Sequence, residues 1–399
     1  MRGALRGPIA ARIDELLERR AGADVAYFDA ESARLAELCH RMAERFARGG
    51  RLLALGASPQ ARSDARHVAV EFVHPVIVGK RALPALGLAG EGGPLEAQTD
   101  LAAEPEDIVM AFEPEAAGAV GLARERGCLT IAFEPCGAEW QLEPSAEDPF
   151  LRQEISETAY HLLWELVHVF FEHRGLLRGR EARPVHDTGA SSFLYPFLAE
   201  SETDLDAVLA DVRESVLAKA VEIAGLRAQT IAEGREELSA AAAGLRARLD
   251  AGGRLLALGN GGSATDAMDA VADMRCPLRE WPSRPALDLT EDSAILTAIA
   301  NDIGTAALFA RQVIAHGREG DVLLAMSTSG NSVNVIEALA EARRGGLETI
   351  AMVGYDGGKV AGDRLADHVV VTRSENIPRI QEAQASAWHV IRELMEVVP

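Results

Sequence analysis

Gly252-Gly-Arg-Leu-Leu-Ala-Leu-Gly-Asn-Gly-Gly-Ser263 places four apolar residues between glycines, and its first eight residues recur at 49–56. Both copies follow stretches of helical periodicity, at 30–47 and 236–251. The pattern predicts a buried strand that ends in a tight turn and leads into another helix. A strand, a glycine turn and a helix in that order are typical of a parallel α/β sheet. The sequence therefore predicts this architecture twice.

The repeat continues downstream of these strands. Asp107-Ile-Val-Met-Ala-Phe parallels Asp321-Val-Leu-Leu-Ala-Met. Each copy then ends in a Gln-Glu pair with a histidine eight residues after the Gln, as Gln153 and His161 in one and Gln381 and His389 in the other. Short β-like runs are predicted at 52–55, 108–112, 129–133, 255–258, 322–326 and 349–353.

The repeat predicts three parts of the chain. Residues 1–174 and 207–399 would each form an α/β domain, a parallel sheet flanked by helices in a three-layer, flavodoxin-like sandwich. The polar, proline-containing stretch 175–206 would link them.

Composition limits the partners and the compartment. The 399 residues include 61 Asp and Glu against 40 Lys and Arg, for a formal net charge of −21. Nucleic-acid binding relies on clustered basic residues, so we expect no nucleic-acid partner. No apolar run reaches the length of a membrane span. The four cysteines form no CxxC pair, and we expect a cytoplasmic protein without a membrane partner.

Two polar loops follow predicted strands in the second copy. Asn260-Gly-Gly-Ser263 follows the strand at 255–258, and Ser327-Thr-Ser-Gly-Asn-Ser332 follows the strand at 322–326. Hydroxyls and the free N–H groups of a helix N-terminus bind an oxyanion without a basic side chain. The carboxyl ends of parallel strands are where α/β sheets bind ligands. Either loop alone fits ordinary turn and cap residues equally well.

Together, GNGGSA at 259–264 and STSGNS at 327–332 resemble the sedoheptulose 7-phosphate isomerase (phosphoheptose isomerase) branch of the sugar isomerase (SIS) domain proteins. The resemblance is strong over about 207–398 and weak over 8–173. It implies two tandem SIS domains, the first degenerate, and an aldose–ketose isomerase that acts on a sugar phosphate. The substrate would contact Asn260, Gly261, Gly262, Ser263, Asp302, Ser327, Thr328, Ser329, Asn331, Ser332 and Gln381.

The family pattern also has His and Glu four residues apart, then Gln and His eight apart, and this quartet binds zinc in some members. The second copy departs from the pattern, because Asp269 and Asp273 stand in place of the His and Glu. The first copy keeps the quartet, and we expect it to hold zinc or another divalent metal through His67, Glu71, Gln153 and His161. The alternative is that a degenerate copy retains ordinary half-buried polar residues.

The first copy has lost the phosphate loops. Glu113 and Glu115 stand in the region that corresponds to the serine-rich loop, and their charges would repel a phosphate. We therefore hypothesise one active site that combines the loops of the second copy with the quartet of the first.

The leading interpretation is an isomerase that converts D-sedoheptulose 7-phosphate to D-glycero-D-manno-heptose 7-phosphate. Such a reaction needs a base and a proton donor. We expect Glu71 or Asp273 as the base and His161 or His389 as the proton donor or metal ligand. Another sugar phosphate, or a non-catalytic sensor or regulatory protein, is the alternative. A homo-oligomer, either a pseudodimer or a dimer of two-domain chains, is also expected.

Overall fold

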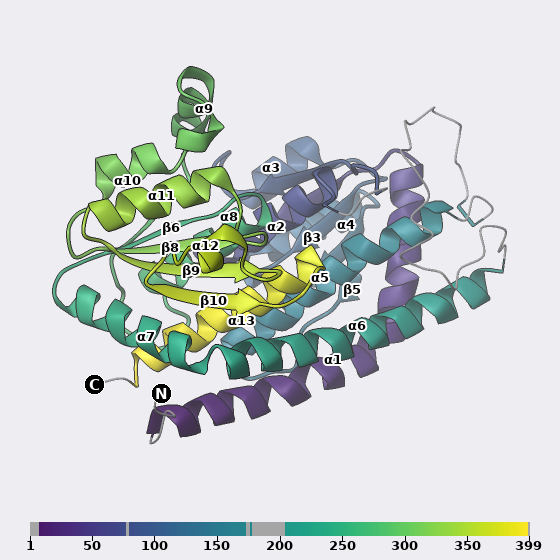
Figure 1. Ribbon diagram of the computed structural model, residues 1–399. Coiled ribbons are helices and arrows are strands. Elements are labelled where there is room, and N and C mark those ends of the chain that lie inside the picture. The colour runs from purple at the N-terminus through teal and green to yellow at the C-terminus, as the bar shows by residue number, and fades with distance from the viewer. Residues whose placement is uncertain (1–7, 77–79, 173–175, 178–203, 398–399) are drawn as a thin grey trace. The chain divides into compact units, whose positions relative to one another are not determined.

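The computed structural model describes residues 8–76, 80–172, 176–177 and 204–397 (Figure 1). Most of the predicted linker, 178–203, lies outside these residues. The described chain forms two compact units. The N-terminal unit is Ala23–Glu222, and the C-terminal unit comprises the residues up to Gly22 and those from Ile223 onward. The predicted domain boundaries follow the sequence repeat and stay a prediction.

The N-terminal unit contains a parallel sheet in the order β2-β1-β3-β4-β5. Its strands are β1 (Leu52–Leu55), β2 (Ala85–Leu88), β3 (Ile108–Ala111), β4 (Leu129–Ala132) and β5 (Trp140–Gln141). Its helices are α2 (Pro59–Val73), α3 (Leu95–Ala102), α4 (Ala117–Glu125) and α5 (Pro149–Glu172), with the short 3₁₀ helix η1 (Pro114–Ala116). The long helices α1 (Pro8–Ala47) and α6 (Leu205–Glu233) each contribute residues to both units.

The C-terminal unit contains a second parallel sheet in the order β10-β9-β8-β6-β7. Its strands are β6 (Leu255–Leu258), β7 (Ala286–Asp288), β8 (Val322–Ser327), β9 (Glu348–Gly354) and β10 (His368–Thr372). Its helices are α7 (Arg235–Asp250), α8 (Gly262–Arg275), α9 (Ser293–Asp302), α10 (Ala310–His316), α11 (Val333–Arg344), α12 (Gly358–Gly362) and α13 (Ile377–Met395), with 3₁₀ helix η3 (Thr305–Ala307).

Successive side chains of the central strands point to opposite faces of the sheet, and helices that cover both faces complete three layers. In β6, Leu255 and Ala257 pack in one core with residues of α7, α8 and α13, whereas Leu256 and Leu258 pack in a second core with residues of α10 and α11. The equivalent strand β1 divides its residues between two cores in the same way. Because every strand residue of β1 and β6 is fully buried, both faces of each sheet are covered. The predicted α/β sandwich is confirmed.

The repeat is also visible in a polar contact that each unit makes between neighbouring strands. The backbone N–H of Arg51 donates to Asp107 Oδ1 at 2.8 Å, and its guanidinium donates to Oδ2 at 2.7 Å. In the C-terminal unit, Arg254 makes the same two contacts to Asp321, at 2.9 and 3.1 Å. The two sheets therefore share strand order and a buried carboxylate that ties the first strand to the third.

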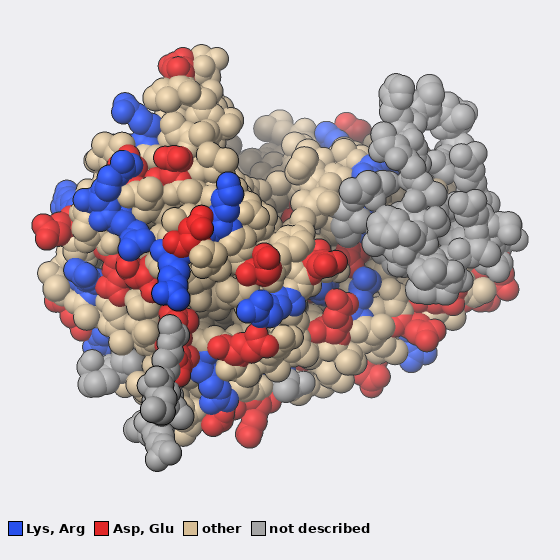
Figure 2. All heavy atoms as spheres, viewed as in Figure 1, with Lys and Arg blue, Asp and Glu red and all other residues tan. Residues whose placement is uncertain are grey.

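Charge is mixed on the surface. On the face shown in Figure 2, acidic and basic side chains are interspersed over the described residues. Within the described residues, no helix is both long and apolar enough to cross a membrane.

Candidate functional site

The loop after β6 is a tight turn into α8. A side chain at Gly259 would collide with the carbonyl oxygen of Ser263, so the turn requires glycine there. Gly261, at the N-cap of α8, has a φ of 58°, in the left-handed region that glycine adopts easily. Ser263, in the first turn of the helix, is buried. The predicted loop thus brings a hydroxyl and a helix N-terminus to the end of β6.

The loop after β8 gathers hydroxyls around a second helix N-terminus. Ser327 Oγ lies 3.4 Å from Ser332 Oγ and accepts the N–H of Gly330 at 3.2 Å. Ser332 is the N-cap of α11, but its side chain makes no capping hydrogen bond. Two hydroxyls and the positive end of the helix therefore lie together, which is the arrangement that binds an anion.

The segment after β9 braces this loop. Gly330 has a φ of 61°, and a side chain there would collide with the carbonyl oxygen of Gly357. Asn331 Oδ1 accepts the N–H of Lys359 at 3.0 Å, and its Nδ2 donates to the Ser329 carbonyl at 3.0 Å. These hydrogen bonds of the Asn331 side chain hold the loop in shape, and its predicted contact with substrate stays a prediction.

A pair of amides connects the two loops. Asn260 Nδ2 donates to Asn334 Oδ1 at 3.1 Å, and Asn334 Nδ2 donates to Asn260 Oδ1 at 2.9 Å. The second asparagine also accepts the N–H of Val335 in the first turn of α11. The N-termini of α8 and α11 are thus fixed relative to each other, as a site formed by both requires.

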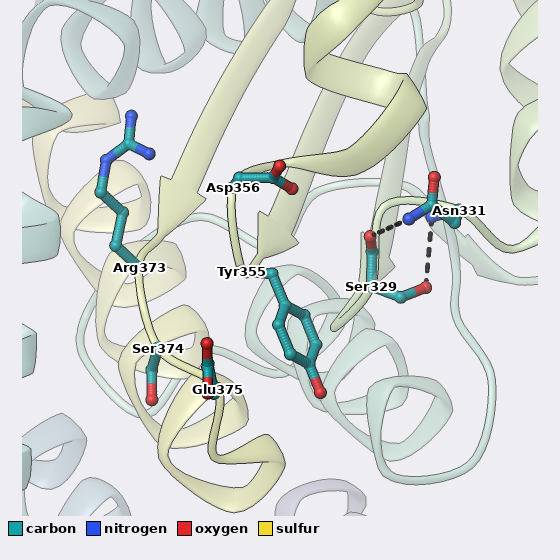
Figure 3. A pocket seen from close by; sticks show the side chains of 7 residues that line it. All are labelled: Ser329, Asn331, Tyr355, Asp356, Arg373, Ser374 and Glu375. Carbon is teal, nitrogen blue, oxygen red and sulfur yellow. Dashed lines mark hydrogen bonds between the residues drawn. The ribbon is translucent and has the colours of Figure 1, made fainter.

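An open pocket of about 800 Å³ lies beside the loop after β8 (Figure 3). Its lining consists of Ser329, Asn331, Tyr355, Asp356, Arg373, Ser374 and Glu375. Figure 3 shows the ring of Tyr355 between Ser329 and Glu375. Hydroxyl, amide and carboxylate groups around an aromatic ring are suited to a ligand with many hydroxyls.

The predicted acid/base residues of the C-terminal unit meet inside the protein. Asp273 on α8 accepts a hydrogen bond from Trp388 Nε1 at 2.9 Å, and its Oδ2 lies 3.8 Å from His389 Nε2. Burial, with the negative charge of Asp269 added, raises the pKa of Asp273 to about 7. Gln381, two turns before His389 on α13, is also buried. Asp273 can therefore exchange a proton near neutral pH.

Asp302 lies apart from this cluster. It is the last residue of α9, a helix of the C-terminal unit with no buried residue, and it accepts a hydrogen bond from the Asn301 amide at 2.7 Å. Figure 1 shows α9 projecting beyond α10 and α11. The predicted contact of Asp302 with substrate stays a prediction.

In the N-terminal unit, the structure brings the predicted metal ligands His67, Glu71 and His161 together. The Nε2 atoms of His67 on α2 and His161 on α5 lie 3.2 Å apart, and Glu71 Oε1 lies 3.8 Å from His67 Nε2. Burial and the charge of a protonated His161 lower the pKa of His67 well below its usual range. A neutral imidazole is the form that ligates metals.

Glu157 joins the two histidines, although the sequence analysis did not single it out. One ligand atom from each of His67, Glu157 and His161 lies within 4.8 Å of the others, and all three residues are buried. Glu157 comes four residues after Gln153 and four before His161, so all three lie along one face of α5. That spacing is the signal that could have identified it.

Tyr160 orients one of these ligands. Its hydroxyl lies 3.2 Å from His67 Nδ1 and donates to Asp64 Oδ1 at 3.4 Å. With the hydroxyl proton directed to Asp64, the Nδ1–H of His67 donates to Tyr160 and leaves Nε2 unprotonated toward His161. A hydrogen bond of this kind to the other ring nitrogen fixes the tautomer of metal-binding histidines. The donor set fits zinc, since two nitrogens on one tetrahedral zinc are separated by about 3.3 Å.

The hypothesis of one active site formed by both copies stays a prediction.

Comparisons with known proteins point to one family. Residues 220–354 match the SIS domain family. Phosphoheptose isomerase from Pelodictyon phaeoclathratiforme is 46% identical over 149 residues, which cover 36% of this chain and 70% of that protein. Phosphoheptose isomerase from Chlorobium phaeobacteroides is 44% identical over 173 residues, which cover 42% of this chain and 76% of that protein.

Solved structures also resemble nearly the whole chain. The C-terminal domain of glucosamine-fructose-6-phosphate aminotransferase from Francisella tularensis matches with a TM-score of 0.61 and covers 96% of this chain and 95% of its own. At 9% identity this similarity concerns the fold alone.

Proposed function

The chain belongs to the phosphoheptose isomerase family of SIS-domain proteins, and from this membership we propose that it converts D-sedoheptulose 7-phosphate to D-glycero-D-manno-heptose 7-phosphate. It is a phosphosugar isomerase of the aldose–ketose type. The observation that carries the proposal is the pair of loops, 259–264 and 327–332, fixed to each other at the ends of two adjacent strands.

We propose that the phosphate binds at these loops. Ser263, Ser327, Thr328, Ser329 and Ser332 would donate hydroxyl hydrogen bonds, and the N-terminus of α11 would add its partial positive charge. Such a site binds a dianion within a chain of strongly negative net charge, because the donors are neutral groups. Asn260 and Asn331 would hold the loops in place. The adjacent pocket would give the carbon chain of the sugar room.

The chemical step moves a proton between neighbouring carbons. A base takes a proton from C1 of the ketose and returns it to C2, while the proton of the C1 hydroxyl passes to the C2 oxygen. Asp273, with its raised pKa, is suited to the base role, and His389, whose Nε2 lies 3.8 Å from Asp273 Oδ2, is the neighbouring group that would relay a proton. Glu71 and His161 are the corresponding candidates in the N-terminal unit.

We propose a divalent metal site, zinc by preference, in the N-terminal unit. His67, Glu157 and His161 would hold the ion, with Glu71 and Gln153 as further ligands. When bound, the ion would supply positive charge that stabilises an oxyanion. The side chains themselves exclude water, because both histidines, Glu71 and Glu157 are buried.

A homo-oligomer is supported by α9. The helix carries Ile295 and Ile299, yet none of its residues is buried, and the adjacent Ile303 is 57% exposed. An apolar helix of this kind usually packs against a partner. A second copy of this chain is the proposed partner, and the molar mass in solution would test it.

A panel of ketose phosphates with five, six and seven carbons tests the substrate. We expect aldose formation, followed by NMR, to be fastest with the seven-carbon ketose. Binding of all three without turnover would favour a phosphosugar sensor, a reading that the replacement of the family's His and Glu by Asp269 and Asp273 supports. Faster turnover of a shorter ketose would reassign the substrate.

A further inference from the structure

The N-terminal unit carries an anion of its own at the turn after β1. The carboxylate of Glu113 accepts the backbone N–H of Ala57 at 2.6 Å through Oε1 and that of Ser58 at 2.8 Å through Oε2. Ser58 is the N-cap of α2, and its side chain makes no capping hydrogen bond. Although Glu113 is charged, its residue is only 5% exposed. The buried carboxylate is thus bound by two amides at a helix N-terminus, the donors that bind anions elsewhere.

Strand register identifies the equivalent position in the other unit. Leu52 pairs with Ile108 in the N-terminal sheet, as Leu255 pairs with Val322 in the C-terminal sheet. Counting five residues from each strand start places Glu113 at the position of Ser327. Counts of five and six residues from Leu52 and Leu255 place Ala57 and Ser58 at the positions of Asn260 and Gly261, in the other phosphate loop.

The two turns also share their shape. A side chain at Gly56 would collide with the carbonyl oxygen of Ala61, as one at Gly259 would with that of Ser263. Both turns have three residues, 56–58 and 259–261, and Pro59 stands at the first position of α2. The turn with its free amides is therefore retained in the N-terminal unit, but the amides of Ala57 and Ser58 bind the side chain of Glu113.

We propose that the Glu113 carboxylate fills the anion position of the N-terminal unit, and that removing it uncovers a latent site for phosphate. The equivalence with a phosphate site rests on the proposed function of the 327–332 loop. The amides of Ala57 and Ser58 keep an anion as their partner even though this unit has lost the serine-rich loop, because the Glu113 carboxylate accepts from both. One sugar phosphate, and not two, would then bind to each chain.

The test uses the full chain and inorganic phosphate as the probe, with binding measured by calorimetry. The Ser327→Ala/Ser332→Ala variant removes the proposed site of the C-terminal unit and should bind no phosphate. Adding Glu113→Ser, which installs the residue type of the equivalent position, should restore one equivalent. Glu115→Ser in the same background is the control, because Glu115 is exposed two residues away and should restore nothing.

Two results would overturn the proposal. One is a folded Glu113→Ser chain, checked by circular dichroism, that gains no phosphate equivalent. The other needs no variant: a wild-type chain that binds two equivalents. If the wild-type chain bound no phosphate but the Glu113→Ser chain bound one equivalent, the phosphate site of the proposed function would be wrong. The latent site in the N-terminal unit would be supported.

Discussion

His67 and His161 face each other through their Nε2 atoms at 3.2 Å, although 94 residues separate them in the sequence. The two residues come from different helices, α2 and α5, that pack in the N-terminal unit. Either a single proton or one metal ion can occupy the space between two such nitrogens. The proposed metal site depends on the second of these arrangements.

Metal analysis separates the two. The protein purified without chelator should contain about one zinc or similar divalent ion per chain, and His161→Ala should lose most of it, since removing a ligand costs a large share of the affinity. His74→Ala, which changes an exposed histidine of the same unit, should keep the ion. Equal metal content in wild type and His161→Ala would leave the histidines as a hydrogen-bonded pair.

Asp273 should make stability depend on pH. Its pKa is about 7 in the folded protein and about 3.9 in the unfolded chain. Over this interval the folded state holds a proton that the unfolded state has lost. The stabilisation that the Asp273 carboxyl adds to the free energy of unfolding is therefore fully present below about pH 4 and is lost as the pH rises toward 7.

Asp273→Asn removes this dependence, because the amide cannot ionise while its oxygen still accepts from Trp388. The stability difference between wild type and variant should change by roughly 2–4 kcal/mol from pH 4 to 7. Denaturant unfolding of both proteins at several pH values measures it. If the free energies of unfolding of the two proteins changed with pH in parallel, the pKa of Asp273 would not be raised.

Two single substitutions show which carboxylate acts as the base. If Asp273 is the base, Asp273→Asn should lower kcat by about 10²–10⁴ and remove the rise in kcat near pH 7, whereas Glu71→Gln should keep that rise. If Glu71 is the base, Glu71→Gln should instead lower kcat by this factor, whereas Asp273→Asn should keep most of the wild-type kcat. Steady-state rates from pH 5.5 to 8.5 measure the effect. Near wild-type kcat in both variants would contradict either assignment.

Gly330 should be intolerant of any side chain. Gly330→Ala places a methyl group against Gly357 at a positive φ, so the phosphate loop must shift. We expect KM for the sugar phosphate to rise at least about tenfold and stability to fall by about 1–3 kcal/mol. Gly225 is an exposed position of α6 with open space around it, so Gly225→Ala should be neutral or stabilising by up to about 1 kcal/mol. Unchanged KM in Gly330→Ala would show that the loop does not bind phosphate in this form.

The sequence predicted the central strands and both loops because their signals are local. The runs at 52–55 and 255–258 are apolar, bounded by glycine and fully buried in the structure. The strands β2, β5, β7 and β10 were missed. They lie outside the central three strands of each sheet, and three of them have only two to four residues. Short strands of this kind depend on pairing that only the fold provides.

Contacts across the fold were beyond the sequence. The first copy has a fifth strand, β5, which follows β4 after a shorter connection than the one between β9 and β10. Glu113 was expected only to repel phosphate, whereas its carboxylate bonds Ala57 and Ser58. Sequence spacing cannot show that residues more than 50 positions apart are in contact. The hydrogen bonds of the Glu113 carboxylate to this turn are therefore visible only in the structure.

The most direct test of the central claim is kcat/KM for sedoheptulose 7-phosphate in wild type and in Ser327→Ala/Ser332→Ala. We expect turnover by the wild type and a loss of about a hundredfold or more in the variant, since two hydroxyl donors to a charged group are removed. The folded variant, checked by its melting temperature, should otherwise resemble wild type. Equal kcat/KM in the two proteins would contradict phosphate binding at these loops.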